Sequence, residues 1–163
     1  MKAKGRKLPL SAERLLTDDQ LKAVGCLAIE SSQLEILIEQ LIETLSGRLI
    51  ADLLLERKMF DAKVKILRTL LVPRVPDLEL KKRTQAICAD IKSDIAYRNT
   101  AIHGDWGRES FNALAPRKAD SIATRKSGAH SVKATELITL AHRFSEHREA
   151  LEDLWIDAFH PKS

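Results

Sequence analysis

The sequence has few of the residues that build β-rich, secreted or metal-stabilised proteins. Aromatic residues make up 4% of the 163-residue chain, with only two cysteines, six glycines and five prolines. Strands draw on aromatic and β-branched side chains, so this composition, rich in Leu, Ile and Ala, favours helices. Cys26 and Cys88 lie far apart in the sequence. We therefore expect no disulfide framework, no metal site and no cofactor. We also expect the protein to be located in the reducing cytoplasm.

Long apolar runs are also missing. The sequence contains no stretch of about 18 apolar residues, the length that could cross a membrane. The basic segment 2–7 is not followed by the apolar core of a signal peptide. Hydrophobic residues make up 44% and charged residues 31%, a balance typical of one globular domain. The formal net charge of +4 permits an anionic partner without requiring one.

Four long amphipathic segments predict an all-α fold, a four-helix up-and-down bundle. Capping, proline and glycine signals bound these helices, which we expect at about 17–46, 60–72, 77–103 and 135–159. The bundle domain is thus expected over residues 17–160, after a flexible basic arm formed by residues 1–16.

Two connecting segments have weaker patterns. Residues 48–59 are expected to form a short helix or an irregular link, with Leu53, Leu54 and Leu55 packed inward. Helical periodicity fails between Asp105 and about Ser131. There we expect a small hairpin between helices three and four, formed by residues 113–119 and 121–125.

Arg98 breaks the apolar stripe of the third helix. At about 100° per residue, it lies in the middle of an arc of roughly 80° formed by isoleucines, which are Ile87, Ile91, Ile95 and Ile102. A buried guanidinium without a partner is costly. We therefore expect Arg98 to pair with a carboxylate of the first helix, Glu30 or Glu35, or to reach an opening.

Arg98, Asn99 and His103 share one sector of this helix near its end. They supply a fixed cation, an amide and a group that titrates near neutral pH. These groups suit a phosphodiester, because Arg can bind the phosphate and neutral His can take a proton from a hydroxyl. In the alternative interpretation, Arg98 pairs with Glu35 only to hold the core, and His103 is a cation at a helix C-terminus.

The segment from Tyr97 to Trp106, Tyr-Arg-Asn-Thr-Ala-Ile-His-Gly-Asp-Trp, resembles the signature of the HEPN superfamily. The family pattern is Arg, a polar residue that is often Asn, three variable residues and His, near the end of the third main helix of a four-helix bundle. The pairing of Arg-Asn with His-Gly-x-Trp, together with the Leu34-Glu35 step, is similar to a bacterial branch. The resemblance covers about residues 17–158, and only residues 97–106 are specific.

The resemblance implies metal-independent RNA cleavage, with His103 activating the ribose 2′-hydroxyl and Arg98 stabilising the transition state. It also implies a homodimer that brings two motifs to one cleft. Trp106 and Tyr97 are supporting candidates, either for stacking on a base or for closing the end of the bundle. Two other functions stay open: an RNA- or nucleotide-binding module without turnover, and a helical dimerisation or scaffold protein.

Overall fold

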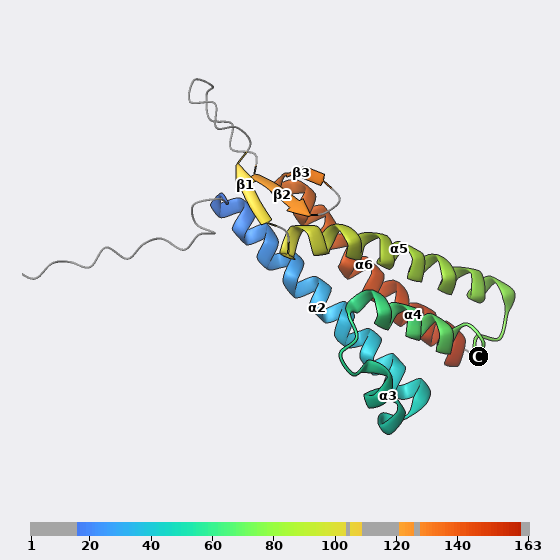
Figure 1. Cartoon of the computed structure of the whole chain (residues 1–163). Helices are drawn as coiled ribbons and strands as arrows, with labels where there is room; N and C mark the ends of the chain where they lie inside the picture. Colours follow the sequence, from blue (N-terminus) through green and yellow to red (C-terminus); the bar gives the residue numbers. More distant parts are fainter. Residues whose placement is uncertain (1–15, 104, 109–120, 126–127, 161–163) are drawn as a thin grey trace, which may run out of the picture.

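The computed structural model describes residues 16–103, 105–108, 121–125 and 128–160. This part of the chain is mainly helical, as predicted, with a small sheet at one end (Figure 1). The predicted basic arm falls outside the described residues except for Leu16, which is buried against the domain.

The first long helix, α2 (Asp18–Ser46), begins and ends where the sequence predicts. The Thr17 hydroxyl accepts a hydrogen bond from the Gln20 backbone N–H at 3.2 Å, and the Gln20 side chain accepts one from the Thr17 N–H at 3.0 Å. This reciprocal capping box satisfies two helix-start donors. Gly47 ends the helix with a φ of +79°, which glycine adopts without steric cost.

The short helix α3 (Arg48–Leu55) changes the predicted order of helix directions. It folds back from α2, so the next helix, α4 (Phe60–Leu71), starts beside the middle of α2. Lys63 near the start of α4 contacts Glu35, and Arg74 beyond its end reaches the carbonyl of Leu45. The later residue of the α4 segment thus contacts the later residue of α2, so α4 runs parallel to α2. The four long helices therefore do not alternate strictly up and down.

The prediction that Leu53 to Leu55 all pack inward is also wrong. Leu53 is 69% exposed, whereas Leu54 and Leu55 are partly buried. Ala51 is the buried residue of this helix, since in an eight-residue amphipathic helix three consecutive side chains cannot share one face.

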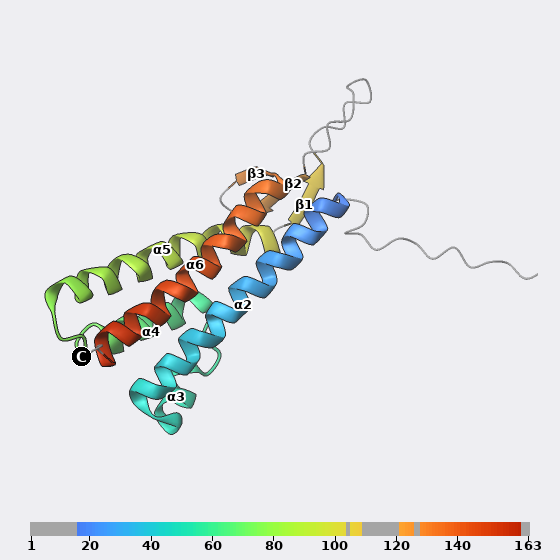
Figure 2. The ribbon, with the colours of Figure 1, turned by 180° about the vertical axis from the view of Figure 1, so that it is seen from behind.

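The two remaining helices are α5 (Leu78–His103) and α6 (Ala134–Phe159). The Asp77 side chain caps the start of α5 by accepting backbone N–H groups at 2.7 and 2.9 Å. Helix α5 runs toward the sheet, and α6 runs back from it alongside α2 (Figures 1 and 2). The buried apolar stripes of α2, α5 and α6 form the core, with Leu34, Ile38, Ile91, Ile95, Leu140 and Phe144 among its fully buried side chains.

A three-stranded antiparallel sheet connects α5 to α6. Its strands are β1 (Asp105–Arg108), β2 (Ser121–Arg125) and β3 (Gly128–Val132), with β2 in the centre. The predicted strand at 121–125 is present, but it pairs with β1 and β3. The strand expected at 113–119 lies outside the described residues. The Gln20 side chain donates to the carbonyl of Val132 at 2.9 Å, which ties the sheet to the start of α2.

None of the described helices is long and apolar enough to cross a membrane.

Candidate functional site

The last turns of α5 lie beside the first half of α2, on a side of the domain that α4 does not reach. Helix α4 begins at the level of Glu35, to which Lys63 donates at 2.6 Å. Arg98 lies nearer the sheet, where its Nε donates to the Ser31 hydroxyl at 3.2 Å across the gap between α5 and α2. Because α4 does not extend past Glu35 toward the sheet, no helix in the described part of the chain covers Arg98 on this side, and its side chain is half-buried.

The structure brings Arg98, Asn99 and His103 together. The Nη1 of Arg98 donates to Asn99 Oδ1 at 3.0 Å and lies 3.3 Å from His103 Nε2. A guanidinium can only donate hydrogen bonds, so the imidazole accepts at Nε2 and carries its proton at Nδ1. His103 itself is exposed. The cluster thus presents an imidazole and a fixed cation at the surface.

Neither carboxylate expected beside Arg98 forms an ion pair with it in the described part of the chain, although the Glu30 oxygen that faces Arg148 has no hydrogen-bond partner there. Glu35 forms an ion pair with Lys63 at 2.6 Å, and Glu39 binds the same ammonium group. Burial alone would lower the pKa of Lys63, but the hydrogen bonds that its ammonium group donates to these two carboxylates, and their negative charges, raise it overall. Glu30 faces α6, with an oxygen 3.8 Å from Arg148. Among the described residues Arg98 forms no ion pair with Glu30 or Glu35, and its half-buried position agrees with the other expectation, that it reaches an opening.

Glu35 still acts on Arg98 through space. Burial lowers the pKa of the Arg98 guanidinium, and the charge of Glu35 raises it in compensation. In the described part of the chain, the hydrogen-bond partners of Arg98 are Ser31, Asn99 and His103, and none of them is a carboxylate. A partly desolvated guanidinium with no carboxylate in direct contact keeps donors free to bind an anion.

The hydrogen bond of Tyr97 and the strand pairing of Trp106 lie outside the cluster of Arg98, Asn99 and His103. The Tyr97 hydroxyl donates to Glu136 of α6 at 3.3 Å. Burial and the neighbouring Glu136 carboxylate raise the pKa of the phenol, and Arg143 lowers it. Trp106 lies in β1, paired with Ala123 of β2. Tyr97 therefore links α5 to α6, on another side of α5 from Ser31.

Sequence reasoning missed the residue that positions Arg98. Ser31 is fully buried, and its hydroxyl donates to the carbonyl of Ala28 at 3.2 Å while it accepts from Arg98. The available signal was its place on the apolar stripe of α2, four residues after Leu27 and three before Leu34. A small hydroxyl there marks a point where a polar group from another helix enters the core.

A second buried polar cluster was also missed. Asp94, one turn before Arg98 on α5, accepts a hydrogen bond from His147 at 2.9 Å and forms an ion pair with Arg143 at 3.1 Å. Asp94 is buried and His147 half-buried, so the cluster fastens α5 to α6. The sequence contains a signal for this cluster, because Asp94 is a carboxylate directly beside Ile95 of the apolar stripe.

Comparison of the chain with protein-family models, curated proteins and solved structures found no match.

Proposed function

We propose that this protein is a HEPN-like, metal-independent endoribonuclease. The observation that carries the proposal is the contact between Arg98 Nη1 and His103 Nε2 at 3.3 Å, on a side of the domain left open by α4. A phosphate bound by the guanidinium lies next to the imidazole nitrogen that accepts protons. Asn99, hydrogen-bonded to the same Nη1, orients the guanidinium, and Ser31 holds its inner edge.

The reaction needs only a base and a stabilising cation. His103 takes the proton of the ribose 2′-hydroxyl, and the 2′-oxygen forms a bond to the adjacent phosphorus. Arg98 stabilises the extra negative charge of the transition state. The bond from phosphorus to the 5′-oxygen then breaks, and that oxygen takes a proton from water. The proton that His103 gained passes to the hydroxide left behind, which restores the base. The products are a 2′,3′-cyclic phosphate and a 5′-hydroxyl.

The proposal includes a homodimer. Apolar side chains lie exposed on the α3 end of the domain, with Leu49 78%, Ile50 53% and Leu53 69% exposed. Contiguous exposed apolar residues of this kind typify association surfaces. A two-fold symmetric interface through α3 would place two Arg98/His103 motifs in one particle. Because α3 lies at the other end of the domain from the sheet (Figure 1), the two motifs would lie in separate clefts.

The experiment is cleavage of mixed single-stranded RNA in excess EDTA by the wild type and by the His103→Ala variant. Losing a general base lowers a rate by about 10²- to 10⁴-fold. Because His103 is exposed, the variant should keep its melting temperature. His142→Ala is a matched control, since His142 is exposed on α6 and belongs to neither polar cluster. An inert wild type, or equal cleavage by wild type and His103→Ala, contradicts the proposal.

A further inference from the structure

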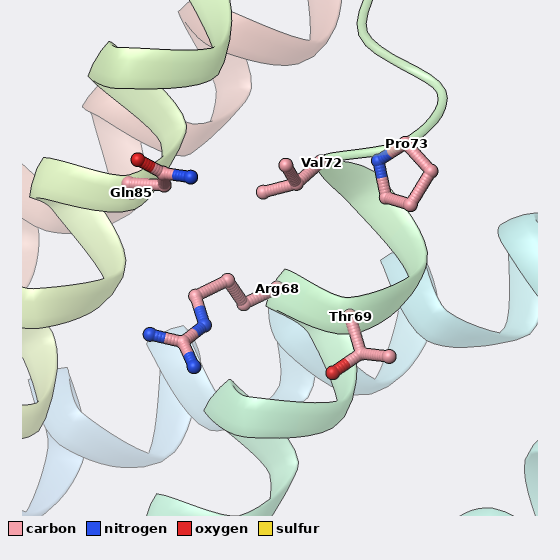
Figure 3. A pocket seen from close by; sticks show the side chains of 5 residues that line it. All are labelled: Arg68, Thr69, Val72, Pro73 and Gln85. Carbon is pink, nitrogen blue, oxygen red and sulfur yellow. The ribbon is translucent and has the colours of Figure 1, made fainter.

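A groove runs between α4 and α5 outside the Arg98 site. At one end it is lined by Arg68, Thr69, Val72 and Pro73 from α4 and the turn after it, and by Gln85 from α5. Figure 3 shows the Arg68 side chain extending from α4 toward α5, while the Gln85 amide points back toward Val72. The adjoining hollow, of about 660 Å³, continues past Arg68 toward the start of α4, where Asp61, Lys65, Lys92 and Ser93 line it.

The groove is basic and its charges are not neutralised. Lys65, Arg68 and Lys92 are all exposed, and none of them forms an ion pair with a carboxylate in the described part of the chain. The one carboxylate among the described lining residues is Asp61. By contrast, Lys63 and Arg143 on the neighbouring helix faces are paired with acids. Three unpaired cations along one groove repel one another, and a bound polyanion removes this cost.

The α5 wall of the groove leads directly to the candidate site. Residues spaced alternately three and four apart share one face of a helix. From Gln85 onward these residues are Gln85, Ala89, Lys92, Ala96, Asn99 and His103. None of them is acidic. Lys92 and Asn99 lie seven residues apart, or about 10 Å along the helix axis.

We propose that the groove between α4 and α5 binds the phosphate backbone of single-stranded RNA and leads it to Arg98 and His103. This inference rests on the proposed function, because it names the path that the substrate takes to that site. Lys65, Arg68 and Lys92 contact successive phosphates, while Thr69, Gln85 and Ser93 offer neutral hydrogen-bonding groups. A row of cations with few aromatic neighbours recognises backbone charge and not base sequence.

The test measures binding of a labelled 12-nucleotide single-stranded RNA to the full chain carrying His103→Ala, so that no cleavage occurs during the titration. In this background, one variant carries Lys65→Gln, Arg68→Gln and Lys92→Gln. A matched control carries Lys22→Gln, Arg48→Gln and Arg57→Gln. These control side chains are also exposed and lie outside the groove, and the change in net charge is the same.

Each cation that contacts a phosphate of a single strand contributes about −0.7 to the slope of log K against log salt concentration. The slope of the groove variant should therefore be less negative by about 2. Its Kd near 0.15 M salt should rise on the order of 10- to 100-fold. Single substitutions, which leave the fold least disturbed, should each remove about 0.7. The control should bind as its parent does.

Equal slopes and affinities for the groove variant and the control overturn the groove assignment. A poly-glutamate peptide is the second probe, and tighter binding of that peptide than of RNA also overturns it in favour of an acidic protein partner. Cleavage by the wild type in parallel separates the two proposals. A cleaving wild type with groove-independent binding refutes the groove alone, whereas groove-dependent binding without cleavage refutes the nuclease alone.

Discussion

Replacing Arg98 by alanine should cost little stability, because no carboxylate among the described residues is in direct contact with this guanidinium. Had Arg98 paired with a buried carboxylate, the substitution would strand that charge at a cost of about 3–5 kcal/mol. Glu35 instead keeps its ion pair with Lys63. Ser31 keeps its hydrogen bond to the carbonyl of Ala28, and the exposed His103 can turn to water.

The expected loss is therefore one hydrogen bond to Ser31, about 1 kcal/mol, plus the packing of the aliphatic part of the side chain. Together these give a loss of about 1–2 kcal/mol in the free energy of unfolding. For a domain of this size that corresponds to a fall of roughly 2–8 °C in Tm. RNA cleavage should fall much further, by about 10²- to 10³-fold, since removing a transition-state donor costs that much.

Urea denaturation followed by circular dichroism measures the stability term. Two double-mutant cycles locate its source, one pairing Arg98→Ala with Ser31→Ala and the other pairing it with Glu35→Gln. The coupling free energy should be about 1 kcal/mol with Ser31 and smaller with Glu35. A loss above 3 kcal/mol for Arg98→Ala, or a larger coupling with Glu35 than with Ser31, would refute this account.

Four further outcomes follow from the structure. Asp94→Asn should lower the free energy of unfolding by about 1.5–3 kcal/mol, because it weakens charge-assisted bonds to two α6 side chains, and a value within 0.5 kcal/mol of wild type in urea denaturation would contradict that role. Burial raises the pKa of the Cys88 thiol to about 11, although Arg68 lowers it. The unfolded thiol ionises first, so stability should fall as pH rises from about 9 to 11, and a Cys88→Ala variant should lose that part of the pH dependence. At pH 8 a thiol reagent should modify the exposed Cys26 and spare Cys88, and equal rates would argue against the packing. Light scattering should give about twice 18.3 kDa for the wild type and a shift toward the monomer for Leu53→Glu, whereas a wild-type mass of 18.3 kDa at every concentration would exclude the dimer.

The sequence by itself determined the helices and most of their ends, because the signals are local. The capping box of Thr17 and Gln20, the glycine at 47 and the prolines after α4 act on backbone groups within a few residues. The apolar stripes set which face of each helix is buried. The place of Arg98, Asn99 and His103 on one sector of α5 follows from the same helical geometry, and their side-chain contacts agree with it.

Only the tertiary structure decided how those elements meet. The direction of α4 depended on whether the chain through α3 folds back along α2 before α4 begins, which no local sequence pattern specifies. The partners of Arg98 depended on competition among distant charges: Lys63 from α4 and Arg148 from α6 lie near Glu35 and Glu30, which left the guanidinium to Ser31. The groove between α4 and α5 likewise joins side chains at least 12 residues apart in the sequence. The burial and charge balance of each side chain depend on what every neighbouring helix brings, and periodicity along one helix does not contain that information.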